Sequence, residues 1–148
     1  MLLGGVHRWS AAAEAHLHFA ARAEHLARMI MPALEAGMTV VCDRFADSTL
    51  AYQGYGQGAD RALIQGLTRL LPRQPDVTLV LRVSPGVAAA RMVARRQAPD
   101  RYEAMDAGFH ARVAEGFAEI AAAEPERCRV IDADGGLDEV RAAIWAGL

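Results

Sequence analysis

The stretch VTLVLRVSP, residues 77–85, decides the fold class of this chain. Its first seven residues are aliphatic or β-branched apart from one arginine, and such a run predicts a β-strand. Ser84 and Pro85 follow directly as a helix cap and a first-turn proline, so they predict a helix that begins where the strand ends. A strand that passes at once into a helix is typical of α/β proteins.

The same alternation extends toward both ends of the chain. Apolar runs and apolar periodicity predict two further strands and three further helices, at 39–42, 129–132, 10–34, 60–71 and 137–145. Ser10 is the predicted cap of the first helix, and Gly37 follows its end. Because short apolar strands between helices pair in parallel, we expect an open parallel sheet with flanking helices, in which 39–42 is a buried strand.

Two more helices complete the pattern. The helix that begins at Pro85 carries Arg91, Arg95 and Arg96, and a loop with Pro99 follows it. In the next helix apolar residues recur at helical spacing, which predicts core packing rather than a cofactor site; they are Met105, Phe109, Val113, Phe117 and Ile120. No repeat or linker interrupts the chain, so we expect a single domain over residues 1–148.

The charge composition excludes some functions. Sixteen basic residues, all of them arginine, stand against eighteen acidic residues, and the formal net charge is −2. We therefore expect no broad cationic surface for nucleic acid or for a membrane. The absence of lysine excludes a catalytic, Schiff-base or phosphate-cradling lysine from these 148 residues.

The cysteines and the apolar runs indicate the compartment. Cys42 and Cys128 lie far apart in apolar stretches without a second ligand at metal-binding spacing, so we expect two buried thiols, no metal, and a reducing environment. MLLGG, residues 1–5, is too short for a signal-peptide core, and no run reaches the ~18 apolar residues of a membrane span. We expect a cytoplasmic protein.

The clearest functional signal lies after the first predicted strand, where ligands collect in open α/β sheets. Arg44 has a planar fork that matches a phosphate or a carboxylate, and Asp43 can hold such a fork or a metal-bound water. An ordinary ion pair at the end of a strand is the alternative interpretation of this pair.

The residues that follow combine hydroxyl groups, an aromatic plane and an amide. They are Ser48, Thr49, Tyr52 and Gln53. A base and a sugar need this mixture of stacking surface and hydrogen-bonding partners, so we expect these side chains to face one pocket. Gly54, Gly56 and Gly58 then predict a loop that bends around it.

Other candidate residues lie on helices. His18 and Arg22 are four residues apart and share a helix face, although each could be a surface residue. Arg91 and Arg95 share a face in the same way, and Arg101 follows within DRYE, residues 100–103. Such arginines are often solvated, but they can also neutralise a transferring phosphoryl group. Together they suggest a nucleotide and a second phosphorylated ligand.

The stretch DRFADSTLAYQGYGQG, residues 43–58, resembles the nucleoside-monophosphate site of thymidylate kinases, which are P-loop kinases. The likeness includes FAAR at 19–22, PALEAG at 32–37, PDVTLVLRVSP at 75–85, DRYE at 100–103 and VIDA at 130–133. The resemblance implies transfer of a phosphoryl group from ATP to dTMP, giving dTDP, with Mg²⁺, by a homodimer that associates through its helices.

The resemblance also implies roles for the substrate site. Arg44 would grip the dTMP phosphate with Asp43 beside it, and Arg22 would contact dTMP. Thr49 and Gln53 would lie on the base side, with Tyr52 near the deoxyribose, and Ser48 would also bind the substrate. The family usually stacks a phenylalanine on thymine at the position of His18, so His18 or Phe19 would supply that plane.

The remaining roles concern the ATP side. Arg91, Arg95 and Arg101 would belong to a lid that closes over ATP, with Arg95 and Arg101 acting in catalysis. Arg82 stands where the family often has an aspartate.

One part of the family pattern is not found in these 148 residues. Thymidylate kinases begin with a strand, a G-x-x-x-x-G-K-[ST] loop, a helix and a second strand, and the sequence contains no such loop. We expect roughly sixty residues, about two βα units, to be missing, and this chain to be an inactive fragment that is poorly stable, aggregated, or rearranged so that 39–42 and 77–83 pair directly. The alternatives are a non-catalytic nucleotide-binding relative and a deoxynucleoside kinase; Arg22 and Arg44 argue against the latter by offering charge for a phosphate.

Overall fold

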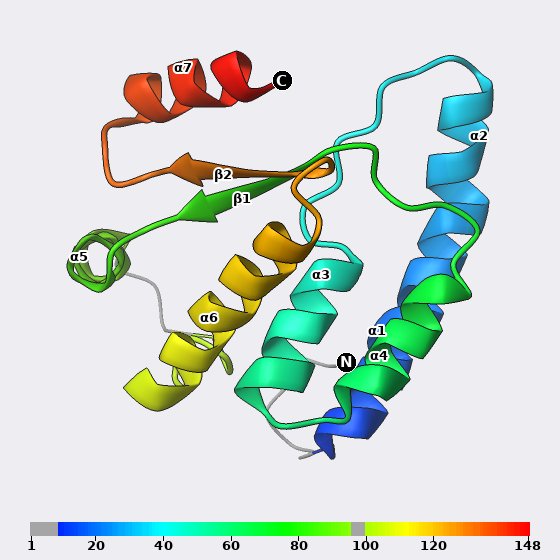
Figure 1. Ribbon diagram of the computed structural model, residues 1–148, viewed down its shortest axis with the longest axis horizontal. Helices are drawn as coiled ribbons and strands as arrows, with labels where there is room; N and C mark the ends of the chain where they lie inside the picture. The colour runs from blue at the N-terminus through cyan, green and yellow to red at the C-terminus, as the bar shows by residue number, and fades with distance from the viewer. Residues whose placement is uncertain (1–8, 96–99) are drawn as a thin grey trace. The chain divides into compact units, whose positions relative to one another are not determined.

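The computed structural model describes residues 9–95 and 100–148, so MLLGG, Arg96 and Pro99 lie outside the described residues. The chain separates into two compact units. Unit 1 comprises Met1–Gln74 and Ala107–Gly116, and unit 2 comprises Pro75–Asp106 and Phe117–Leu148. Figure 1 labels the helices and strands of both units.

A long helical run opens unit 1, and it consists of α1 (Ala11–His25), η1 (Leu26–Ile30) and α2 (Met31–Glu35). The Ser10 hydroxyl accepts a hydrogen bond from the Ala13 backbone N–H at 3.2 Å, and Gly37 leaves the helix with φ of 75°. The predicted helix, cap and stop are therefore confirmed. The turn of π-helix at η1 lies just before Pro32, which has no N–H to donate and whose ring crowds the preceding turn.

The predicted strand at 39–42 is wrong. These residues belong to no strand, and the Val41 side chain is 94% exposed. Direct pairing with 77–83, one of the three outcomes expected of the fragment, is not found, because the described sheet has two strands and does not include 39–42. An apolar, β-branched run becomes a strand only when a neighbouring strand satisfies its backbone groups, and local sequence does not supply that neighbour.

The predicted glycine loop is mostly helical. The segment after Arg44 forms α3 (Ala46–Thr49) and η2 (Leu50–Gly56), and α4 (Arg61–Arg69) follows. A Cβ atom on Gly56 would lie 2.5 Å from Phe109 Cε2, and one on Gly54 would lie 3.2 Å from Leu50 Cδ1. Of the three glycines at 54, 56 and 58, only Gly58 has a φ that favours glycine, at 77°. Two of the three glycines therefore allow close packing, and one makes the turn.

The core of unit 1 lies between α1 and the segment that runs from α3 to α4. Its buried residues are Ala15, Phe19, Ala46 and Ile64. The first part of α6 (Ala107–Ala123) also belongs to unit 1, where the Phe109 and Tyr52 rings meet edge to face at 6.0 Å. Arg112 Nη2 donates to the Gly56 carbonyl at 2.9 Å.

The predicted apolar stripe on α6 is correct in its centre. Phe109, Val113 and Ile120 are buried, and Phe117 is partly buried. Met105 is an exception, because it precedes the helix and is 40% exposed.

Unit 2 holds a parallel sheet of β1 (Thr78–Arg82) and β2 (Cys128–Asp132), paired from Thr78↔Cys128 to Arg82↔Asp132. α5 (Pro85–Arg95) follows β1 as predicted, and α7 (Leu137–Gly147) packs against β2, as Figure 1 shows. The α/β fold with parallel strands and flanking helices is thus confirmed. Arg82 forms an exposed ion pair with Asp132 at 3.8 Å.

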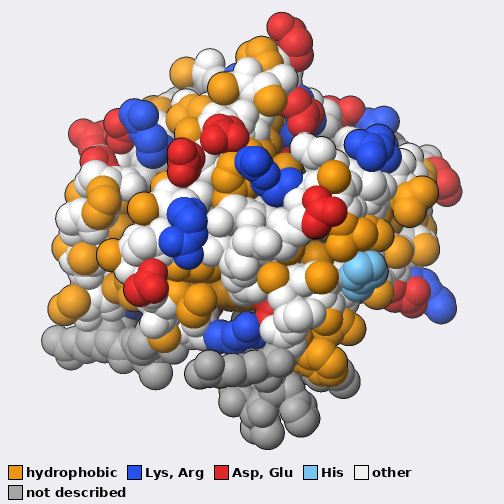
Figure 2. All heavy atoms as spheres, turned by 60° about the horizontal axis from the view of Figure 1, so that its bottom comes forward, with side chains coloured by type: hydrophobic (Ala, Val, Ile, Leu, Met, Phe, Trp, Pro, Cys, Tyr) orange, Lys and Arg blue, Asp and Glu red, His pale blue; other side chains and the backbone are white. Residues whose placement is uncertain are grey.

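The surface carries charges of both signs. On the face that Figure 2 shows, blue arginines and red carboxylates are interspersed with apolar side chains, and neither sign gathers into a broad patch. Among the described residues, no helix has the length and the apolar character that a membrane crossing requires.

Candidate functional site

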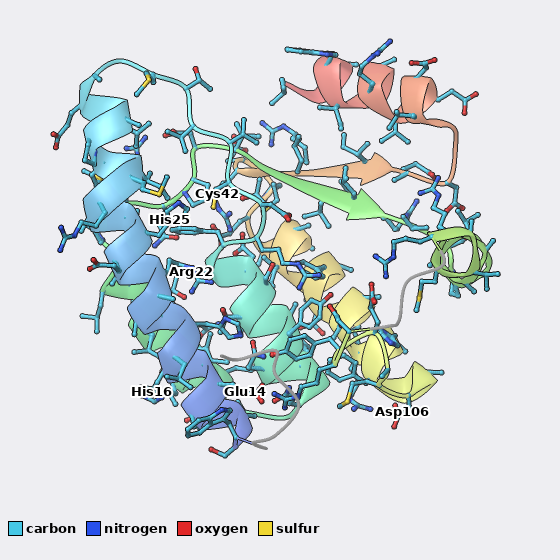
Figure 3. The ribbon with its side chains drawn as sticks, turned by 180° about the vertical axis from the view of Figure 1, so that it is seen from behind. Glu14, His16, Arg22, His25, Cys42 and Asp106 are labelled. Carbon is cyan, nitrogen blue, oxygen red and sulfur yellow. The ribbon has the colours of Figure 1, made fainter. Side chains whose placement is uncertain are left out.

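A hollow of about 160 Å³ opens in unit 1 between α1 and the loop before α3. The residues that line it are His18, Ala21, Arg22, His25, Arg44 and Phe45. Four of these side chains carry or can carry positive charge, and none is a carboxylate. A hollow with this lining suits an anionic ligand that also has an apolar or aromatic part. Figure 3 labels Arg22 and His25 beside it.

Arg22 is held rigidly on one side of the hollow. Its Nη2 atom donates to the Phe45 carbonyl at 2.9 Å and to Thr49 Oγ1 at 3.1 Å. The guanidinium lies between two rings, 4.7 Å from the centroid of Phe19 and 5.1 Å from that of Phe45. Burial lowers the pKa of Arg22. Its Nη1 atom is buried without a hydrogen-bond partner among the described residues, so a donor is left that a ligand could use.

Arg44 lies on the other side of the hollow in a strained conformation. Its φ of 63° is the only positive value among the described residues that are not glycine, and such strain concentrates at functional sites. Arg44 Nη2 donates to the Tyr52 hydroxyl at 3.3 Å, and Cys42 Sγ donates to the Arg44 carbonyl at 3.5 Å. Asp43 is exposed and forms no ion pair in the described part of the chain, so the alternative of a structural ion pair gains no support.

The two cysteines differ from the expectation in one respect. Cys128 is buried and forms no disulfide in the described part of the chain, as predicted, but Cys42 is only partly buried. The reason is that 39–42 is not covered as a strand would be in a larger sheet.

His18 and Phe19 differ in how deeply their side chains are buried. Phe19 is 5% exposed and packs in the core beneath Arg22, whereas His18 is part of the lining of the hollow. Burial lowers the pKa of His18, and the charge of Arg22 lowers it further, so a neutral imidazole faces the hollow at neutral pH. Of the two candidate aromatic planes, only that of His18 is placed to meet a ligand.

The other substrate-side candidates lie behind the lining. Thr49 and Tyr52 hold Arg22 and Arg44, respectively. Ser48 is partly buried within α3. Gln53 is 1% exposed, and its Nε2 atom donates to Glu14 Oε2 at 3.3 Å. The structure therefore brings three predicted residues to the hollow (His18, Arg22 and Arg44) and directs the amide of Gln53 elsewhere.

Sequence reasoning missed three residues of this region, namely Glu14, His25 and Gln57. Gln57 Nε2 also donates to Glu14 Oε2, at 3.0 Å. Glu14, His18 and Arg22 follow each other at intervals of four, so they share one face of α1. That spacing was the available signal, and Figure 3 labels Glu14 and Arg22 along this helix.

The predicted lid arginines lie in unit 2 and are bonded within it. Arg91 Nη2 donates to the Gly135 carbonyl at 2.7 Å. Arg95 Nη2 lies 2.6 Å from Glu103 Oε1, and this hydrogen bond raises the pKa of Arg95. Arg101 Cζ lies 5.6 Å from the centroid of the Tyr102 ring. Arg91 and Arg95 are exposed, and each is hydrogen-bonded within this unit.

Residues 9–95 and 100–148 contain no group of three or more His, Cys, Asp or Glu side chains that could hold a metal. No described residue is therefore assigned to Mg²⁺.

The fold is of the α/β class, and the lining of the hollow suits an anionic ligand. The thymidylate kinase family model matches residues 2–144. A thymidylate kinase from Gluconobacter oxydans (strain 621H) is 48% identical over 148 residues, covering 97% of this chain and 69% of the relative. One from Solidesulfovibrio magneticus is 45% identical, covering 90% of this chain and 68% of the relative.

A solved structure agrees with these relatives. The crystal structure of thymidylate kinase from Ehrlichia chaffeensis superposes with a TM-score of 0.76 at 34% identity, covering 98% of this chain and 68% of that chain. The chain belongs to the thymidylate kinase family, a family of phosphotransferases. It spans about two thirds of the length of these relatives.

Proposed function

We propose that this protein acts in the ATP-dependent phosphorylation of dTMP to dTDP, and that the hollow in unit 1 binds dTMP. The observation that carries the proposal is the pair of arginines that line the hollow, each held by a neighbouring side chain, together with the ring of His18 in the same lining. A nucleoside monophosphate offers a matching anion and a matching plane.

Each residue has a role in this proposal. Arg44 binds the 5′-phosphate, because its guanidinium is partly exposed to the hollow and held by Tyr52. Asp43 lies beside this phosphate, and Arg22 uses its unbonded Nη1 atom to donate to the nucleoside. His18 stacks on the base. Ser48, Thr49 and Gln53 support the base side of the site.

The phosphoryl donor and the assembly are proposed from the family. ATP is the donor, Mg²⁺ accompanies it, and Arg91, Arg95 and Arg101 act on its phosphates when they leave their present partners. We propose a cytoplasmic single-domain subunit that forms a homodimer and does not bind nucleic acid. Because the 148 residues contain no G-x-x-x-x-G-K-[ST] loop and no lysine, they do not catalyse the transfer by themselves.

Calorimetric titration of the chain tests the substrate class. We expect dTMP to bind more tightly than thymidine, because only dTMP carries the phosphate that Arg44 meets. Equal affinities would contradict the proposal and favour a deoxynucleoside kinase. A coupled assay for dTDP tests the second part: turnover at about 1 s⁻¹ or more, as kinases show, would contradict the expected inactivity of these 148 residues.

A further inference from the structure

The polar face of α1 carries two anchored side chains, one in the lining of the hollow and one outside it. Arg22 forms one anchor through its bonds to Phe45 and Thr49. Glu14 lies two helical turns earlier on the same face, and its side chain is fully buried. The lining residue His18 lies between these two anchors.

Glu14 binds the segment that carries Tyr52. Its Oε2 atom accepts from Gln53 Nε2 at 3.3 Å and from Gln57 Nε2 at 3.0 Å. Gln53 directly follows Tyr52, and Gln57 directly follows η2 as its C-cap. A buried carboxylate is costly unless donors stabilise it, and here two amide groups from one helical turn do so.

This helical turn is unusual in a way that needs support. η2 is a π-helix, in which the Gln57 N–H donates to the Tyr52 carbonyl at 3.0 Å, five residues back. Such turns are rare and occur frequently at functional sites. The two amide groups that Glu14 binds lie near the middle and at the end of this turn, so they oppose its relaxation to an ordinary α-helix.

We propose that Glu14 is a positioning residue: by holding Gln53 and Gln57 it fixes η2 against α1, and so places Tyr52 where it supports the guanidinium of Arg44 across the hollow from Arg22. This inference rests on the proposed function. Arg44 depends on that support, because its left-handed backbone is strained and its side chain is held by Tyr52. Arg22 does not depend on it, because it has its own partners.

The loss of Glu14 should therefore affect the phosphate end of a ligand and spare the nucleoside end. The variant Glu14→Gln keeps the shape of the side chain but removes its charge. Glu24→Gln is the matched control, because Glu24 lies on the same helix, is exposed and pairs with Arg28 at 2.9 Å. Gln57→Ala is a second variant, which removes one of the two donors and leaves the carboxylate in place.

The experiment measures the affinities of each chain for dTMP and thymidine by calorimetry. We expect Glu14→Gln to weaken dTMP binding about tenfold and thymidine binding less than about twofold, since charge-assisted hydrogen bonds are the stronger ones. Gln57→Ala should also lower the ratio of the affinity for dTMP to the affinity for thymidine. Glu24→Gln should leave this ratio unchanged. A ratio that stays at the wild-type value in both Glu14→Gln and Gln57→Ala would overturn the positioning role.

A second measurement separates this role from general destabilisation. The NMR resonance of the Arg44 side-chain Nε–H should shift in Glu14→Gln and not in Glu24→Gln, at a temperature where both variants are folded. An unshifted resonance would overturn the inference even if dTMP binding fell. If the wild-type chain does not bind dTMP more tightly than thymidine, the proposed function fails. If the wild-type chain prefers dTMP and Glu14→Gln keeps that preference, only the positioning role of Glu14 fails.

Discussion

The phenol of Tyr52 supports the guanidinium of Arg44 in two ways. Arg44 Nη2 lies 3.3 Å from the Tyr52 hydroxyl, and Arg44 Cζ lies 4.9 Å from the centroid of the ring. The two residues are eight positions apart and belong to a loop and to η2. This contact fixes a charge that the strained backbone at Arg44 presents to the hollow.

Replacement of Arg44 by alanine should weaken dTMP binding far more than ATP binding. The expected loss is about 2–4 kcal/mol, because a charged donor to the phosphate disappears. Calorimetric titration of both nucleotides measures this difference. Tyr52→Phe should produce a smaller loss of about 1 kcal/mol, because the ring remains and the hydroxyl does not. An unchanged dTMP affinity in Arg44→Ala would refute the assignment.

The alanine variants of His18 and Phe19 should have different consequences. His18→Ala should weaken dTMP binding by about 1 kcal/mol or more, since a stacking plane is lost. Phe19→Ala should lower the free energy of unfolding by about 3–5 kcal/mol, because it leaves a cavity in the core. Titration and urea unfolding distinguish the two effects. His16→Ala is the control, since His16 is exposed and bonds to the Ala12 carbonyl. The assignment of the base plane fails if His18→Ala binds dTMP normally.

His18 should make stability depend on pH in a defined direction. Its pKa lies below 6.5 in the folded chain, because burial and then Arg22 disfavour the charged ring; Arg44 adds to this and Glu14 opposes it. As the pH falls through 6.5, the unfolded chain binds more protons than the folded chain, so the free energy of unfolding decreases until the folded pKa is reached. Urea unfolding of wild type and His18→Phe between about pH 8 and pH 5 tests this. The wild type should lose more stability than His18→Phe; parallel curves would argue against the effect.

Two glycine substitutions should have opposite signs. In Gly56→Ala the new Cβ would lie 2.5 Å from Phe109 Cε2, so overpacking should destabilise unit 1 by about 1–3 kcal/mol. Gly66→Ala is the control within α4, where the nearest atom, Arg69 Nη2, is 3.9 Å away. This second change should stabilise by about 0.5–1 kcal/mol, because alanine favours a helix. Chemical denaturation measures the free energy of unfolding of both variants. Equal changes in this free energy would show that packing does not require glycine at position 56.

Residues that act through their neighbours in sequence could be predicted. Ser10 was recognised as a helix cap because its hydroxyl bonds only three residues ahead. Pro85 marked the passage from β1 into α5, because its fixed φ suits the first turn of a helix. Arg44 and Arg22 could be named as phosphate-binding candidates from their side-chain chemistry and their position in a family-like motif. Local hydrogen bonding, helical periodicity and side-chain chemistry are properties of short segments.

Distant contacts decided the rest. The run 39–42 is not a strand, because strand formation needs a partner that the run itself does not contain. Gly56 is required by Phe109, more than fifty positions later, and Gln53 is directed to Glu14, 39 positions earlier. The choice of His18 over Phe19 as the plane in the hollow depended on which side of α1 the core covers. Sequence alone therefore determined the family, most helices and the charges of the site, while packing between distant segments decided which side chains reach the hollow.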